Sequence, residues 1–98
     1  MRKKYLLAPI AENDIDEIVT YIAQDNVNAA LKMVDSFFTA MDMLAEHPQS
    51  GHVRSDITKQ QVRFWPVKSR YLIIYKDCNP IEIVRVLSGY RDIANLLF

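Results

Sequence analysis

The hydrophobic period differs between the two halves of this chain. Between residues 9 and 46, apolar residues recur at three- and four-residue spacing, which is typical of amphipathic helices. Between residues 62 and 87 they recur in short runs separated by turn residues, which is typical of strands. The apolar stripes of the helices need a surface to pack against, and the sheet is the natural one. The pattern therefore predicts an α+β fold.

Local signals set the limits of the first elements. Residues 3–8 read as a short strand closed by Pro9, which also suits the first position of a helix. This helix is predicted to end near Gln24. Asp25-Asn26 supplies a turn and an N-cap for a second, longer helix. That helix stops at His47-Pro48, because proline cannot continue the backbone hydrogen bonds. The two helices form a hairpin.

Three strand-like runs follow a polar stretch at residues 49–61 that we expect to be a loop. The runs are residues 62–67, 71–76 and 81–87. Their connections are short enough for antiparallel hairpins. The predicted order is an N-terminal strand, a two-helix hairpin and a three-stranded antiparallel sheet (β-α-α-β-β-β) with a short C-terminal tail. With 98 residues, half of them hydrophobic, we expect one domain over residues 1–98.

The compartment follows from what the sequence lacks. The basic residues 2–4 are followed by an apolar stretch that Pro9 interrupts, unlike a secretory signal. No run approaches the roughly 20 apolar residues that a membrane helix needs. The single cysteine, Cys78, cannot form an internal disulfide. We expect a cytoplasmic protein with no membrane partner.

Charge is balanced overall but divided along the chain. The net charge is zero, which argues against a domain whose main partner is a nucleic acid. Residues 1–49 hold four Lys and Arg against eight Asp and Glu, whereas residues 50–98 hold eight against four. The helices are therefore expected to be acidic and the sheet basic.

Metal, cofactor and nucleophile sites are poorly supported. His47, His52 and Cys78 do not fall at the spacings of zinc sites. Cys78 with either histidine has no local signature of a catalytic pair. Gly51 and Gly89 are isolated, so no phosphate-binding loop is predicted. We expect no metal and no cofactor.

Both faces of the predicted sheet are largely apolar. In the last strand, strict alternation puts Ile81, Ile83, Arg85 and Leu87 on one face and Glu82, Val84 and Val86 on the other. The helices can cover only one face. The other face predicts a protein partner, or else a strongly twisted sheet over which the tail folds back.

Basic and aromatic residues are interleaved in the second half. They are Arg54, Lys59, Arg63, Lys68, Arg70, Arg85 and Arg91, with Phe64, Trp65, Tyr71, Tyr75 and Tyr90. Such a mixture can pair with phosphates and stack on bases. The same residue types are enriched at the centres of protein interfaces. A third interpretation is a solvated sheet edge with aromatic residues in the core. Zero net charge favours a protein partner.

Six segments resemble the ParE branch of the ParE/RelE toxin superfamily of bacterial toxin–antitoxin modules. They are residues 11–23, 47–51 (H-P-Q-S-G), 54–57, 62–63, 71–75 and 84–93, which ends in R-V-L-S-G-Y-R-D-I. The order and spacing of these segments carry the resemblance, and the last is the most specific. The resemblance implies a small α+β toxin that is neutralised by a cognate antitoxin and assembles with it into a higher-order complex.

Two activities divide that superfamily. RelE-like members cleave messenger RNA in the ribosome, and ParE-like members inhibit DNA gyrase without a reaction of their own. The RelE branch has an arginine directly after the tyrosine that opens the middle strand, and a tyrosine or histidine near the C-terminus. Here Leu72 follows Tyr71, and the tail offers residues 96–98, Leu-Leu-Phe. Arg91 matches a RelE-type arginine, but its high pKa makes it a poor proton shuttle. Many ParE relatives also have histidine where Ser88 stands.

The resemblance therefore implies gyrase inhibition by protein binding, with no catalytic residues. A ribosome-dependent messenger RNA endoribonuclease is the alternative, and a non-toxic interaction module is a third hypothesis. The predicted target-facing residues are Arg63, Trp65, Arg85, Tyr90, Arg91 and Phe98. The predicted antitoxin-facing surface is the helix hairpin with the sheet residues Ile73, Tyr75, Ile83, Leu87 and, in the tail, Leu97. No direct contact with nucleic acid is expected.

Overall fold

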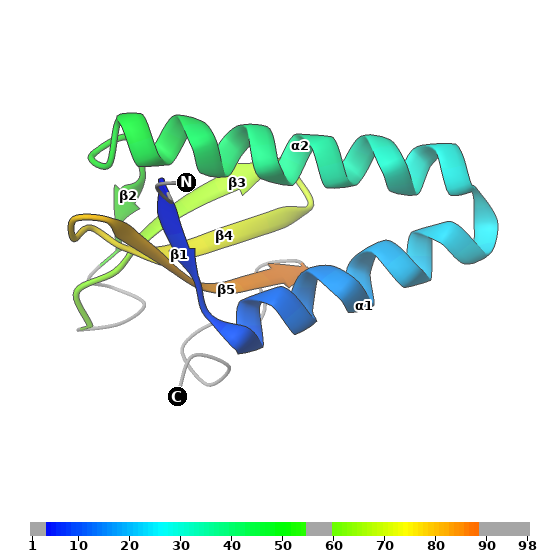
Figure 1. Ribbon diagram of the computed structural model, residues 1–98, viewed down its shortest axis with the longest axis horizontal. Helices are drawn as coiled ribbons and strands as arrows, with labels where there is room; N and C mark the ends of the chain where they lie inside the picture. The colour runs from blue at the N-terminus through cyan, green and yellow to red at the C-terminus, as the bar shows by residue number, and fades with distance from the viewer. Residues whose placement is uncertain (1–3, 55–59, 89–98) are drawn as a thin grey trace.

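A computed structural model describes residues 4–54 and 60–88 of the chain (Figure 1). Its elements are β1 (Tyr5–Leu7), α1 (Pro9–Asp25), α2 (Val27–Glu46), β2 (His52–Val53), β3 (Arg63–Val67), β4 (Tyr71–Lys76) and β5 (Ile81–Ser88). The predictions for Tyr90, Arg91, Leu97 and Phe98 lie outside the described residues. The α+β class and the helix hairpin are confirmed.

One residue joins the two helices. The backbone N–H of Asn26 donates to the carbonyl of Ile22 at 2.9 Å, which closes α1. The Asn26 side chain accepts from the backbone N–H of Ala29 at 3.0 Å, which caps α2. The turn between the helices extends beyond the strands, so the hairpin overhangs the sheet (Figure 1).

The sheet has five strands, one more than the four that were predicted, and the additional strand is β2. Their order is β1-β5-β4-β3-β2, with β1 parallel to β5 and all other pairs antiparallel. β2 lies in the segment predicted to be a loop, where His52 pairs with Phe64 and Val53 with Arg63. β1 lies within the strand predicted at residues 3–8, whereas β2 has two residues, too few for a hydrophobic period to identify.

The main core lies between the helices and one face of the sheet. Its buried residues are Ala11, Ile15, Phe37, Met41, Leu44, Val67, Ile73, Tyr75, Ile81, Ile83 and Val86. The rings of Phe37 and Tyr71 meet edge to face, with centroids 5.5 Å apart. In the described part of the chain, neither helix is long and apolar enough to cross a membrane.

An irregularity in β5 overturns the strict alternation. Ile74 pairs with Arg85 and Tyr75 pairs with Ile83, so Val84 is an extra residue between two paired positions. Beyond it the faces exchange, and Val86 joins the helix-side core while Leu87 points to the opposite face. The prediction that Leu87 shares a face with Ile83 is wrong for this reason.

A second buried cluster lies on the face of the sheet away from the helices. It comprises Val62, Phe64, Leu72, Ile74 and Leu87, none of them more than 6% exposed. This face is therefore already buried within the chain. Its apolar pattern does not by itself require a partner.

Candidate functional site

Asp14 anchors α1 to the free edge of β5. β1 pairs only with residues 81–83 of β5, so the Val86 N–H beyond that point has no strand partner on this side. The Asp14 carboxylate accepts this N–H at 3.0 Å. It also accepts the Arg85 Nε at 2.7 Å and Nη2 at 2.9 Å in a bidentate pair. Asp14 thereby fixes the direction in which β5 runs toward Ser88.

This contact determines the electrostatics of Arg85. Its hydrogen bond to Asp14 raises the pKa of Arg85, against a smaller opposing effect of burial. Asp14 is 8% exposed, and the Arg85 side chain is 17% exposed. Arg85 was predicted to face a target. In the structure its guanidinium is bound to Asp14, and this contact joins the end of β5 to α1.

Arg63 is also engaged within the chain. Its Nε donates to Asp77 at 3.0 Å, and its Nη1 donates to the carbonyl of Gly51 at 3.0 Å. These bonds tie β3 to the loop that follows α2 and to the turn that follows β4. Arg63 was predicted as a target contact, and the structure places it as a clamp between two connections.

Tyr75 explains why glycine stands at the end of the H-P-Q-S-G segment. The Tyr75 hydroxyl donates to the carbonyl of Pro48 at 2.6 Å and accepts the N–H of Gly51 at 2.9 Å. A Cβ atom on Gly51 would lie 2.5 Å from that hydroxyl, so only glycine fits. Burial raises the pKa of Tyr75 above its ordinary value of 10.0. The segment is a docked loop.

The predicted antitoxin-facing sheet residues lie in the interior. Ile73, Tyr75 and Ile83 are 0% exposed beneath the helices, and Leu87 is 6% exposed in the second cluster. They offer a partner no surface in this structure, because the helices cover one face and the β5 irregularity moves Leu87 to the other. Trp65 is half-buried and packs against the main core.

A cleft lies between α1 and the connection from β3 to β4. It has a volume of about 590 Å³ and is lined by Glu17, Ile18, Tyr21, Ser69, Arg70, Tyr71 and Ser88. A neighbouring cavity of about 540 Å³ shares Tyr21, Arg70 and Tyr71. The φ angles of Lys68 and Ser69 are 56° and 61°, as a tight hairpin turn requires. The turn presents exposed Arg70 opposite Tyr21, which is 76% exposed.

Sequence reasoning did not place Tyr21 and Arg70 on one cleft. Arg70 was counted among the basic residues of the second half, and Tyr21 was not singled out. The available signal was an aromatic residue on the polar side of the first helix. An exposed tyrosine and an arginine that line the same cleft suit contact with a protein. Among the described residues, no cluster of His, Cys, Asp or Glu could hold a metal ion.

Comparison with protein families gives a match over residues 5–93 to the ParE toxin of the type II toxin–antitoxin system, parDE. The chain belongs to the ParE toxin family. It is 33% identical over 84 residues to the Sinorhizobium fredii protein Y4kP, which is named as a candidate toxin; the match spans 85% of this chain and 84% of that protein.

A solved structure shares the fold of this ParE-family toxin. It is described as the chromosomal ParDE TA system from P. aeruginosa. The TM-score is 0.71 at 19% sequence identity, with 88% of this chain and 95% of that chain covered. The region matched by the family, residues 5–93, includes the helix hairpin, Arg63, Arg85 and the tight turn at Lys68.

Proposed function

We propose that this ParE-family toxin acts by binding DNA gyrase, without a reaction of its own, and that a cognate antitoxin neutralises it. The observation that carries the choice is Leu72. At the position where the RelE branch has an arginine, this chain has a leucine that is 4% exposed in the second cluster. An apolar buried side chain can neither stabilise a scissile phosphate nor transfer a proton.

The proposed target contacts belong to residues 89–98, which follow β5 in the sequence. They are Tyr90, Arg91 and Phe98, residue types that anchor protein interfaces. Arg85 is assigned a positioning role, because its bidentate bond to Asp14 fixes the strand that leads into this segment. Arg63 and Trp65 are assigned to the scaffold for the same kind of reason. Leu97 is kept as a proposed antitoxin contact.

A supercoiling assay with purified gyrase tests the proposal. The toxin is expected to inhibit supercoiling at micromolar concentration, and Arg91→Ala is expected to weaken that inhibition about tenfold or more, as loss of an interface anchor does. Lys76→Ala is the matched control, because Lys76 is exposed and makes only a 3.9 Å ion pair with Glu82. Absence of inhibition by the wild-type toxin would remove the proposal.

The ribonuclease remains the second candidate because of one residue, Arg91, which matches a RelE-type arginine. Its test is messenger RNA cleavage in a translating extract. Cleavage that disappears in Arg91→Ala would favour the ribonuclease over gyrase binding. Induced expression in a bacterium without growth arrest would contradict both and favour a non-toxic interaction module.

A further inference from the structure

The cleft between α1 and the turn after β3 has an apolar floor that is held in place. Ile18 and Tyr71 are half-buried among the residues that line it. The Tyr71 ring packs edge to face against Phe37, which is 0% exposed, with 74° between the ring planes. Tyr21 lines the same cleft from α1 and is 76% exposed. The cleft therefore offers apolar surface that is in position before a ligand binds, which lowers the cost of binding.

The turn between β3 and β4 brings positive charge to one side of this cleft. Arg70 lines the cleft, and Lys68 belongs to the same turn. Both side chains are exposed. Within the part of the chain that the structure describes, neither cation takes part in a salt bridge. Both can therefore pair with a carboxylate that a partner brings.

The side of the cleft formed by α1 is acidic. Glu17 accepts a hydrogen bond from the side chain of Asn13 at 3.3 Å. The pKa of Arg85 is raised mainly by its hydrogen bond to Asp14, and the charge of Glu17 adds to this effect. Asp25 lines the neighbouring cavity. A phosphate backbone that followed the cleft would meet these carboxylates, whereas a peptide can place a single carboxylate at the basic turn. The charges therefore favour a peptide over a nucleic acid.

Ser88 connects the cleft to the proposed target contacts. It is the last residue of β5 and lines the cleft. Figure 1 shows this end of the sheet, which the helix hairpin extends past. Tyr90 is two residues beyond Ser88, and two residues of chain span at most about 7 Å. A target that contacts Tyr90 therefore also lies near the cleft.

We propose that the cleft binds an acidic segment of the toxin's protein target, with an aromatic or long apolar side chain on the floor and a carboxylate paired with Arg70. The inference rests on the proposed function for the source of that segment, which is then gyrase. Tyr21 and Tyr71 supply the aromatic contact. Arg70 and Lys68 supply the preference for acidic residues. The cleft thereby adds a second contact beside the residues that follow β5.

Two short peptides test the chemistry of the cleft. Both carry one central tryptophan, which is flanked by aspartates in one peptide and by lysines in the other. Fluorescence anisotropy of a dye at the end of the peptide measures its affinity for the full-length toxin. At low ionic strength the aspartate peptide is expected to bind about fivefold more tightly or better, because its charges are opposite to those of the turn. The difference is expected to shrink as salt is added.

Substitutions in the full-length toxin locate the site. Arg70→Glu is expected to remove or reverse the preference for the aspartate peptide, whereas Arg70→Lys retains it. Tyr21→Ala is expected to weaken both peptides by a similar factor of about five or more, because it removes aromatic surface rather than charge. Circular dichroism confirms that each variant is folded, as substitutions at exposed positions allow.

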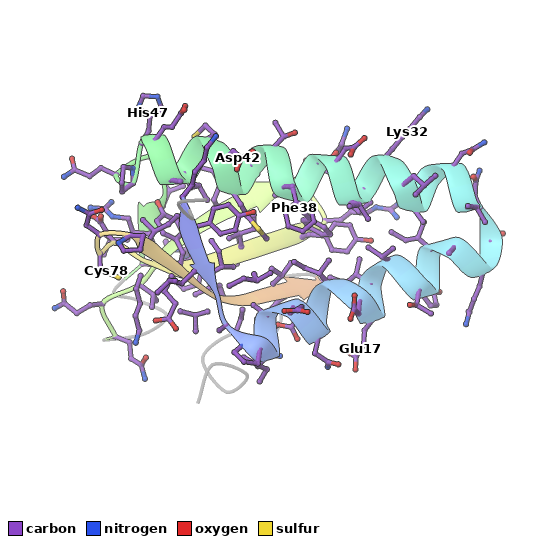
Figure 2. The ribbon with its side chains drawn as sticks, viewed as in Figure 1. Glu17, Lys32, Phe38, Asp42, His47 and Cys78 are labelled. Atoms are coloured by element: carbon purple, nitrogen blue, oxygen red, sulfur yellow. The ribbon has the colours of Figure 1, made fainter. Side chains whose placement is uncertain are left out.

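Lys32→Glu is the matched control for the change of charge. Lys32 is also exposed, and it points away from α1 on the outer side of α2 (Figure 2). This variant changes the net charge as much as Arg70→Glu does, but at a site remote from the cleft. It is expected to retain the preference for the aspartate peptide.

The supercoiling assay with purified gyrase connects the cleft to the target. Arg70→Glu and Tyr21→Ala are each expected to raise the toxin concentration for half inhibition about tenfold, whereas Lys32→Glu leaves it unchanged. Inhibition at the wild-type concentration by folded Arg70→Glu would overturn the inference and leave the proposed function intact.

The remaining outcomes separate this inference from the proposed function. Equal affinities for the two peptides, no binding of either, or an unchanged preference in Arg70→Glu would overturn the inference. Self-association of the toxin in sedimentation that Arg70→Glu abolishes would assign the cleft to a second copy and also overturn it. The predicted peptide preference with no inhibition of gyrase by the wild-type toxin would contradict the proposed function and gyrase as the source of the segment. The anisotropy experiment contains no gyrase, so the two failures are distinguishable.

Discussion

At the scale of single residues, two arginines that were predicted to contact a target form hydrogen bonds within their own chain. Arg63 and Arg85 were predicted as target contacts because arginine is typical of interface centres. The structure shows both bound to carboxylates or carbonyls of their own chain. Sequence could not reveal this, because Asp14 is one of several acidic residues early in α1 and only the packing of the helix turns it toward β5.

Replacing Asp14 tests its role as an anchor. Asp14→Asn is expected to lower the free energy of unfolding by about 2–3 kcal/mol, because it leaves a partly buried guanidinium without its charged partner. Urea denaturation measures the change. Asp16→Asn, at an exposed position of the same helix, is expected to stay within about 0.5 kcal/mol of wild type. Equal effects of the two substitutions would show that the contact does not hold α1 to β5.

The buried hydroxyl of Tyr75 is expected to make the stability of the fold depend on pH in the alkaline range. Because burial raises its pKa in the folded state, its contribution is fully present below about pH 10 and is lost as pH rises through the folded value. Tyr75→Phe leaves the Gly51 N–H without its acceptor and is expected to cost about 1–3 kcal/mol at pH 7.

The alkaline measurement separates the hydroxyl from the ring. Denaturation between about pH 9 and pH 11 is expected to show a steeper loss of stability for wild type than for Tyr75→Phe. Tyr21→Phe, at a side chain that is 76% exposed, is the control and is expected to follow wild type. Parallel curves for wild type and Tyr75→Phe would contradict the role of the Tyr75 hydroxyl.

At the scale of elements, locally determined structure was predicted and long-range pairing was not. The helix starts at Pro9 and Val27 were predicted because caps and hydrophobic period are local signals. β4 was predicted with its observed bounds, Tyr71–Lys76. β1 and β2 join the sheet through partners far along the chain. The extra residue at Val84 could not be predicted, because apolar residues fit a regular alternation on both sides of it.

Asn26 gives the corresponding test for a helix start. Asn26→Ala removes the side-chain acceptor for the Ala29 N–H and is expected to cost about 1 kcal/mol of stability. Thermal unfolding followed by circular dichroism measures this loss. Asn28→Ala, two residues further along the chain and exposed, serves as the control with little expected change. A stability of Asn26→Ala equal to that of wild type would mean that the cap contributes nothing.

At the scale of the whole molecule, the division of charge separates two surfaces. The helix hairpin is acidic and exposes the apolar side chains of Val27, Leu31 and Phe38 on α2. The tight turn after β3 instead carries the positively charged Lys68 and Arg70. The sequence predicted that the two halves differ in sign, but not that an apolar row on α2 stays exposed. In the sequence, the buried and the exposed apolar residues of α2 form one wide stripe, and such a stripe is read as a single buried face.

The central claim is that the toxin inhibits gyrase by binding alone. Titration of toxin against several fixed concentrations of purified gyrase, with supercoiling as the readout, tests it most directly. With gyrase present above the dissociation constant of the complex, the amount of toxin needed for half inhibition is predicted to rise in proportion to the gyrase present, because each inhibited complex retains its toxin. Complete inactivation of excess gyrase by a small amount of toxin, or no inhibition at any ratio, would contradict the account.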